Sequence, residues 1–268
     1  MIRLENTTKI FNQGTADENI AIKNINLTVK EHDFITIIGS NGAGKTTLFN
    51  LIAGSLFPTE GRVMVKDEDL TQEPEYKRAR FIGRIFQDPM LGTASNMTLE
   101  DNMMICLKKG FKGLKISLNR KRREFFREQL KALEMNLENR LKDNVALFSG
   151  GQRQALTLLM MVLSKPALVL LDEHTAALDP KNAQIVLDLT SRFIEDYHLT
   201  TMMITHNMNQ AIQYGNRLLM MDCGEIILDV SGEEKQDLTV DKLIDRFHQI
   251  RQTEFGTDEV LLTKNECD

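Results

Sequence analysis

The hydrophobic positions in the first ninety residues follow the short periods of β-strands. Ile2 to Ile10 and Ala21 to Val29 alternate between apolar and polar residues, as a strand with one solvent-exposed face does. Asp33 to Ile38 is almost continuously apolar, which indicates a strand that is covered on both faces, as in a parallel sheet. Further short strands are predicted at Arg62 to Val65 and at Phe81 to Phe86. The N-terminal part is therefore predicted to be rich in strands.

The pattern becomes helical between residues 89 and 164. Asn119 to Leu141 is a long charged stretch whose apolar residues recur every three to four positions, the spacing of an amphipathic helix. After Pro166, strand and helix patterns alternate again, and a hairpin is predicted around Gly224. The elements predicted between them are a strand at 167–171, a helix at 181–197, a strand at 201–204 and a helix at 208–214. This order predicts an α/β core interrupted by a helical insert.

Composition and charge exclude several classes of protein. The 268 residues carry 33 basic and 38 acidic side chains, and the resulting net charge of −5 argues against a general nucleic-acid-binding surface. No uninterrupted apolar stretch approaches the roughly 18 residues of a membrane-spanning helix. The first residues also lack the basic-then-apolar layout of a secretion signal. We therefore expect a soluble, intracellular chain, for which any role at a membrane would require a partner.

The strand that ends at Ile38 runs directly into a glycine-rich segment. It fits the pattern G-x-x-x-x-G-K-[ST], and it lies in the required place between a buried strand and a helix. Backbone N–H groups of such a loop surround a phosphate chain, and the helix N-terminus adds favourable dipole charge. Lys45 is predicted to reach the β- and γ-phosphates, the Thr46 hydroxyl to bind Mg²⁺, and Thr47 to reach the α-phosphate. The predicted loop residues are Gly39, Ser40, Asn41, Gly42, Ala43, Gly44, Lys45, Thr46 and Thr47.

Two carboxylates follow the apolar strand at 168–171. Adjacent carboxylates at the end of a buried strand are costly to desolvate unless a cation or a proton compensates them. Beside a phosphate-binding loop, Asp172 is predicted to hold Mg²⁺, directly or through water. Glu173 is then predicted to polarise the water that attacks the γ-phosphate.

One helix ahead of these acids lies the run Phe148-Ser149-Gly150-Gly151-Gln152, which resembles the signature of ATP-binding-cassette (ABC) ATPases. Its hydroxyl, its glycine N–H groups and a helix N-terminus would form a second anion-binding surface. In that family this surface contacts the γ-phosphate bound by the opposite subunit, so the resemblance implies a homodimer that shares two ATP sites. The family usually has leucine before the serine, and at Phe148 we expect local repacking without loss of the phosphate contact.

The resemblance covers roughly residues 1 to 230 and implies four further roles. Gln87 would lie in the glutamine loop and sense Mg²⁺ and the attacking water, and His206 would contact the γ-phosphate as the switch histidine. Asp179 would lie in the loop where the two subunits meet, and Phe11 would stack on adenine. The residues alone also allow a turn glutamine, a structural histidine, a helix cap and a core phenylalanine.

The resemblance further implies an α/β fold: a P-loop NTPase (RecA-like) core with an N-terminal antiparallel β-subdomain and an inserted α-helical subdomain. The nucleotide-binding core is expected at 1–88 and 165–230, and the helical subdomain with the signature at 89–164. Residues 231–268 would form a C-terminal helical extension and tail.

The function implied is ATP hydrolysis, with ATP and Mg²⁺ bound, that powers transport through a separate transmembrane permease. Residues 152–180 as a set look most like the ATPase subunits of bacterial importers. More narrowly, they resemble a group that works with a substrate-binding lipoprotein and is linked to tryptophan or other aromatic amino acids. The expected place is cytoplasmic, peripheral on the inner face of the cell membrane. The alternative, a soluble cassette ATPase that acts on ribosomes or DNA, is disfavoured because the chain has a single cassette and no long coiled-coil insert. Nothing in a cassette touches the solute, so the sequence leaves the solute open.

Overall fold

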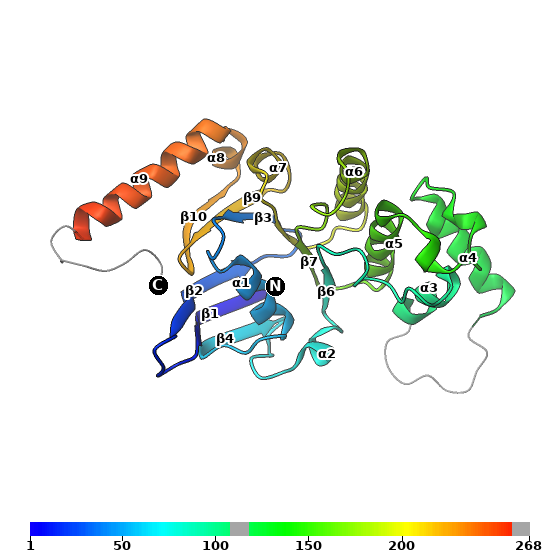
Figure 1. Cartoon of the computed structure of the whole chain (residues 1–268), viewed down its shortest axis with the longest axis horizontal. Coiled ribbons are helices and arrows are strands. Elements are labelled where there is room, and N and C mark those ends of the chain that lie inside the picture. The colour runs from blue at the N-terminus through cyan, green and yellow to red at the C-terminus, as the bar shows by residue number, and fades with distance from the viewer. Residues whose placement is uncertain (108–117, 259–268) are drawn as a thin grey trace. The chain divides into compact units, whose positions relative to one another are not determined.

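The computed structural model describes residues 1–107 and 118–258 (Figure 1). The chain forms two compact units, and each is described by itself. The first unit comprises Met1–Arg78 and the residues from Met202 onward, and the second comprises Ala79–Thr201. The finer boundaries expected from the resemblance (1–88, 89–164, 165–230 and 231–268) stay a prediction.

The first unit contains the predicted N-terminal antiparallel sheet. Its strands are β1 (Ile2–Phe11), β2 (Asn19–Val29), β4 (Glu60–Val65) and β5 (Glu68–Asp69), in the order β2-β1-β4-β5. The alternation seen in the sequence explains this sheet, because Ile2, Leu4, Ile25 and Leu27 point inward and are almost fully buried.

A second sheet of the first unit positions the glycine-rich loop. Strand β3 (Phe34–Gly39) pairs in parallel with β9 (Arg217–Asp222), with Ile37 opposite Leu219. Strand β10 (Glu225–Ser231) lies antiparallel to β9 and completes the predicted hairpin, and β8 (Thr201–Ile204) lies on the other side of β3. The loop after β3 opens helix α1 (Lys45–Ala53), which ends at Gly54 as a left-handed C-cap.

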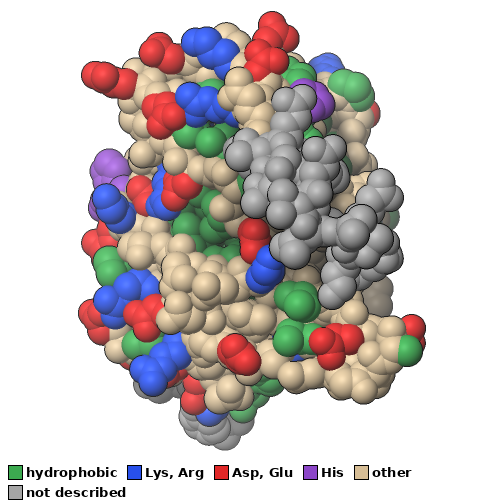
Figure 2. Space-filling model, turned by 90° about the vertical axis from the view of Figure 1, so that its left-hand side faces the viewer, with side chains coloured by type: hydrophobic (Ala, Val, Ile, Leu, Met, Phe, Trp, Pro, Cys, Tyr) green, Lys and Arg blue, Asp and Glu red, His purple; other side chains and the backbone are tan. Residues whose placement is uncertain are grey.

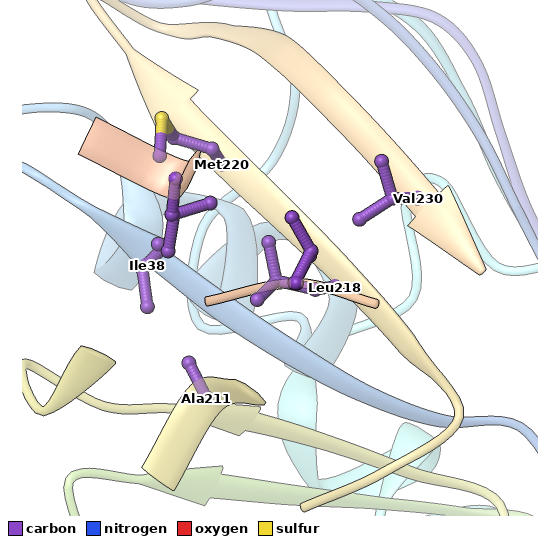
Figure 3. Close-up of a cluster of buried hydrophobic side chains, with 7 residues drawn as sticks. Ile38, Ala211, Leu218, Met220 and Val230 are labelled. Carbon is purple, nitrogen blue, oxygen red and sulfur yellow. The ribbon is translucent and has the colours of Figure 1, made fainter. Parts of the chain in front are cut away.

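The C-terminal segment is part of the core of the first unit. After the short helix α8 (Glu233–Gln236), helix α9 runs from Val240 to Asp258, well beyond the helical pattern visible at 240–250. Leu238 and Leu243 pack into the cluster shown in Figure 3. That cluster joins β3, β9 and β10 to helix α7 (Met208–Gln213) through Ile38, Ala211, Leu218, Met220 and Val230. Residues 238–243 thus help to hold the strand that leads into the loop.

The second unit contains a strand pair and the helical insert. Strands β6 (Ile82–Ile85) and β7 (Leu168–Asp172) pair in parallel. The helices are α3 (Leu99–Leu107), α4 (Arg120–Lys131), α5 (Gly150–Leu163) and α6 (Pro180–Asp196), with short 3-10 turns at Leu137–Asn139 and Val145–Leu147 (Figure 1). The short helix α2 (Glu75–Arg78) belongs to the first unit.

The long amphipathic pattern at 119–141 is helical over only part of its length. Helix α4 ends at Lys131 because Glu134 and Asn136 adopt left-handed backbone conformations, with φ of 56° and 57°. A right-handed helix cannot continue through such residues. The apolar spacing persists beyond the helix because Leu133 and Leu137 still point into the core.

Surface and helix properties add two observations. On the face drawn in Figure 2, the described Lys and Arg side chains are interspersed with Asp and Glu and do not gather into one basic patch. Across residues 1–107 and 118–258, none of the helices combines the length and the apolar character needed to cross a membrane.

Candidate functional site

The phosphate-binding loop has the backbone that its glycines predict. Gly39 and Gly44 have φ of 154° and 94°. A Cβ atom at Gly39 would lie 2.2 Å from the carbonyl oxygen of Met221, and one at Gly44 would lie 2.5 Å from the carbonyl oxygen of Ala21. Only glycine fits at either place, so the loop can approach its neighbours as closely as phosphate binding requires.

The N-terminus of α1 is open to an anion. Its N-cap is Gly44, no side chain caps the first turn, and that turn contains no acidic residue. Lys45 is only 6% exposed, and its Nζ donates at 2.8 Å to the carbonyl oxygens of Gly39 and Ser40. The ammonium group is therefore held inside the loop. A helix N-terminus combined with a buried lysine is a donor set that fits a polyphosphate.

The remaining loop residues differ in their exposure to solvent. Ser40, Asn41, Gly42 and Thr46 are exposed, Thr47 is half-buried and Ala43 is buried. The hydroxyl of Ser40 donates at 3.0 Å to Oδ1 of Asp222, a buried carboxylate at the end of β9. Asp222 could not be singled out from the sequence, because its place beside the loop depends on the pairing of β9 with β3.

Two other predicted residues belong to the first unit. His206 is exposed just after β8. Its neighbour Thr205 is anchored by its backbone N–H, which donates to the carbonyl oxygen of Ile37 at 3.1 Å, and by its hydroxyl, which donates to Gln210 at 2.9 Å. Phe11, at the end of β1, is half-buried, with Nζ of Lys9 at 5.2 Å from the ring centroid. Neither side chain is enclosed in the core.

A cavity of about 340 Å³ lies beside the loop in the first unit. Gly39, Ser40 and His206 contribute to its wall, but most of the wall is apolar and comes from Ile38, Met208, Met220, Leu243, Ile244 and Phe247. An apolar wall cannot replace the hydration of a triphosphate. We therefore place nucleotide phosphates at the N-terminus of α1 and not in this cavity.

The acidic strand end lies in the second unit and has a partner that the sequence analysis missed. Oδ2 of Asp172 lies 2.8 Å from a guanidinium nitrogen of Arg84, and their side chains are 13% and 10% exposed. Arg84 also lies over the ring of Phe86, with its Cζ at 4.7 Å from the centroid. The next residue, Glu173, is half-buried and has a φ of 48°, so the predicted water-polarising residue has a left-handed backbone.

Gln87 and Asp179 lie in the second unit as well. Gln87 is exposed, two residues after the end of β6. Asp179 is the N-cap of α6, and its two carboxylate oxygens accept from the side-chain and backbone nitrogens of Asn182 at 2.6 and 3.1 Å. These bonds lower the pKa of Asp179, the side-chain bond most of all. The helix-cap alternative is therefore correct, and the role of Asp179 between subunits stays a prediction.

The signature run forms the start of α5. Ser149 is the N-cap, its hydroxyl accepts from the backbone N–H of Gln152 at 3.2 Å, and the Gln152 side chain accepts from the backbone N–H of Ser149 at 3.1 Å. This reciprocal capping box fixes the serine at the exposed helix N-terminus. Gly151 packs on Asn182, where a Cβ atom would lie 2.9 Å from the side chain, so the signature and the cap of α6 are in direct contact.

Phe148 is accommodated by local packing. Its ring is 4% exposed, and the guanidinium carbon of Arg140 lies 4.4 Å from the ring centroid. The carbonyl oxygen of Phe148 accepts from Nε of Arg153 at 3.1 Å. The aromatic ring therefore points away from the serine into the unit, and the capping box of Ser149 is intact.

Comparisons with known proteins place the chain in a family. The family model described as "ABC transporter" matches residues 22–176, more than half of the chain. The chain belongs to the ABC transporter family. It is 40% identical over 248 residues to the tyrosine transport ATP-binding protein of Clostridioides difficile (strain R20291), and the match covers 92% of this chain and 98% of that protein.

Two further matches support the ABC assignment. The energy-coupling factor transporter ATP-binding protein EcfA2 of Clostridium tetani (strain Massachusetts / E88) is 31% identical, with 88% of this chain and 80% of that protein covered. The dimeric ATP-binding cassette MJ0796 of Methanocaldococcus jannaschii, solved with ADP and Pi, superposes with a TM-score of 0.71 at 29% identity, covering 86% of this chain and 98% of that one.

Membership of the ABC family confirms several of the predictions from the sequence. The α/β P-loop fold, the ATP-hydrolysing activity and the function as a nucleotide-binding transporter subunit are confirmed, and nothing supports the ribosome or DNA alternative. The resemblance to cassettes for aromatic amino acids is confirmed by the tyrosine transport relative. The roles given to individual site residues stay predictions.

Proposed function

We propose that this chain is the ATPase subunit of a bacterial importer for an aromatic amino acid, tyrosine or a close relative. It would work in the cytoplasm on the inner face of the membrane, under a separate permease that receives solute from an extracellular substrate-binding protein. The observation that supports this substrate class is the 40% identity to a tyrosine transport ATP-binding protein over nearly the full length of both chains.

The chemistry would be divided between the two units of the chain. In the first unit, Lys45 and the open N-terminus of α1 would bind the β- and γ-phosphates, His206 would contact the γ-phosphate, and Phe11 would stack on adenine. In the second unit, Glu173 would orient the attacking water. Mg²⁺, when bound, neutralises phosphate charge.

Three oxygen-bearing side chains would hold Mg²⁺. They are the hydroxyl of Thr46, the amide of Gln87 and the carboxylate of Asp172, and oxygen donors of these types suit this hard cation. The carboxylate of Asp172 already lies 2.8 Å from a cationic group, the guanidinium of Arg84.

Hydrolysis would require a head-to-tail homodimer. Ser149, Gly150, Gly151 and Gln152 begin a helix, and this exposed N-terminus would meet the γ-phosphate that the partner's loop binds. Each chain would therefore contribute a loop to one site and a signature to the other. The dimeric form of the MJ0796 cassette supports this arrangement.

Transport of the proposed solutes can be measured directly. The chain would be reconstituted in vesicles with a candidate permease and substrate-binding protein, and uptake of labelled tyrosine, tryptophan and phenylalanine would be compared with uptake of methionine and choline. We expect uptake of an aromatic amino acid that requires ATP and disappears with Lys45→Ala. Uptake of methionine or choline alone would refute the proposed substrate class while leaving the ATPase assignment intact.

The shared site can be tested by mixing two inactive variants. Lys45→Ala disables a loop, and Ser149→Arg disables a signature, so each pure dimer has no intact site. In a mixed dimer one loop of the Ser149→Arg chain meets one signature of the Lys45→Ala chain, and ATPase activity should partly return. Absence of any activity in mixtures would contradict sites shared between chains.

A further inference from the structure

One buried side chain joins three functional segments of the second unit. Gln154 lies on α5, five residues after Ser149, and is 1% exposed. Its single side-chain nitrogen donates to two backbone carbonyl oxygens, that of His174 at 2.6 Å and that of Phe86 at 3.1 Å. Phe86 directly precedes Gln87, and His174 directly follows Glu173. The amide thus bridges the signature helix, the glutamine loop and the acidic strand end.

These two bonds account for both hydrogens of the amide. A buried carbonyl that loses its donor is costly to leave unpaired, so each end of the bridge is held firmly. The bridge also starts close to the signature serine, since five residues of α-helix span about 7.5 Å. Helix α5 also packs against β6, which ends one residue before Phe86, and against α6.

The acidic end of the bridge holds a strained turn in place. Glu173 has a φ of 48°, a left-handed backbone conformation that is strained for a non-glycine residue. Its carbonyl oxygen accepts from the backbone N–H of Ala176 at 2.9 Å. The next residue, His174, is bonded on two sides: its carbonyl to Gln154 of α5, and its Nε2 to the hydroxyl of Thr190 on α6 at 3.1 Å. The position of the Glu173 backbone therefore depends on both helices.

We propose that Gln154 is a positioning residue that couples the two ATP sites of the dimer. The signature at the start of α5 meets the nucleotide held by the partner chain, whereas Glu173 and Gln87 act on the nucleotide held by their own chain. Through Gln154, occupation of the signature would set the position of Glu173 and Gln87. This inference rests on the proposed shared sites.

The test uses Gln154→Met, which keeps the length of the side chain and removes its donor. Thr157→Val is the matched control: Thr157 lies one turn further along α5, is 6% exposed, and its hydroxyl donates within the helix to the carbonyl oxygen of Arg153. Both variants lose a buried polar group of α5, but only the first touches the segments at 86–87 and 173–174. ATP affinity, kcat and the urea unfolding midpoint would be measured for each.

We expect Gln154→Met to lower kcat by roughly 100-fold, the cost of a misplacement of about 1 Å in an active site. Its ATP affinity should stay within about twofold of the native value, because the phosphate-binding loop belongs to the first unit. Thr157→Val should retain kcat. If Gln154→Met does not fold, Gln154→Asn replaces it, because that side chain is one methylene shorter and cannot reach both carbonyls. Equal kcat values for the Gln154 and Thr157 variants would overturn the proposal.

Hydrogen exchange measures the coupling itself. In a Glu173→Gln background, which should retain ATP in a stable dimer, ATP is expected to protect the amides of 149–156 and of 173–178 together. Adding Gln154→Met should preserve protection of the first segment and lose that of the second. Unchanged protection of both segments would overturn the inference. If ATP protects neither segment in the Glu173→Gln chain, the result refutes the proposed shared ATP sites, and the proposed coupling through Gln154 is refuted with them.

Discussion

Lowering the pH from 7 to 5 should destabilise the second unit through a single histidine. The ring of His174 is 2% exposed, and Nε2 lies 3.1 Å from the hydroxyl oxygen of Thr190. That hydroxyl donates its one hydrogen to the carbonyl oxygen of Val186 at 2.7 Å. It can therefore only accept from the ring, which places a proton on Nε2. Burial lowers the pKa of His174 from 6.5 to about 4, so the folded protein keeps the ring neutral.

The sign and size of the effect follow from proton linkage. Between pH 6.5 and pH 4 the unfolded chain binds a proton at this residue that the folded chain does not. The contribution of the neutral, buried His174 ring to the free energy of unfolding is therefore complete above pH 6.5 and is lost as the pH falls towards 4. These two pKa values correspond to a loss of about 2 kcal/mol at pH 5, and of about 3 kcal/mol in the acid limit.

Urea unfolding, followed by far-UV circular dichroism at pH 7 and pH 5, measures this loss. His174→Gln is the control, since a glutamine amide can still donate to Thr190 but does not titrate. Between the two pH values the native chain should lose about 2 kcal/mol more unfolding free energy than the variant, because all other titrating groups cancel in the comparison. Equal losses in the two chains would show that His174 is not held neutral by burial.

Three further substitutions test individual contacts. Arg84→Met leaves the largely buried carboxylate of Asp172 without its guanidinium partner, so the unfolding free energy in urea should fall by about 3 kcal/mol; an unchanged midpoint would contradict the pair. Gly151→Ala forces a methyl group to 2.9 Å from Asn182, and ATP-dependent dimerisation in gel filtration should weaken; native dimerisation would show that the helices shift freely. Phe148→Leu should cost about 1 kcal/mol of thermal stability with turnover unchanged; lost turnover would give the ring a catalytic role.

The elements predicted well are those determined by neighbouring residues. The alternation of β1 and β2 and the continuous apolar run of β3 appear directly as strands, because side-chain direction repeats every two residues. The loop from Gly39 to Thr46 was equally predictable, since its glycines satisfy requirements of their own backbone, such as the positive φ of Gly44. In such segments the residues that form the sequence pattern also determine the local backbone conformation.

The end of α4 shows where local reasoning is insufficient. The apolar spacing of 119–141 satisfies helical periodicity throughout, yet the chain leaves the helix after Lys131. The periodicity reports only which side chains face the core, and Leu137 faces it from a 3-10 turn as well as it would from a helix. A pattern of buried residues therefore constrains the direction of the side chains more strongly than the conformation of the backbone.

Gln154 could have been identified before the structure. In the sequence Gln154 directly precedes the mostly apolar run from Ala155 to Val162, which predicts a buried helix, so a carboxamide at this position has to find hydrogen-bond partners inside the protein. The sequence thus contained the signal that Gln154 is bonded. It did not contain the partners, because Phe86 lies 68 residues away and His174 lies 20 residues away.

The chemical character of the acidic strand end is predictable from the sequence, whereas its geometry depends on residues that are distant in the chain. Two residues of this strand end depend on three distant neighbours: Asp172 lies against Arg84, and His174 is bonded to Gln154 through its carbonyl oxygen and to Thr190 of α6 through its ring. Adjacent residues in one strand end share a backbone, so a shift imposed on one of them moves the others. We therefore expect a change at any of these three neighbours to shift Glu173, the residue that is proposed to orient the attacking water.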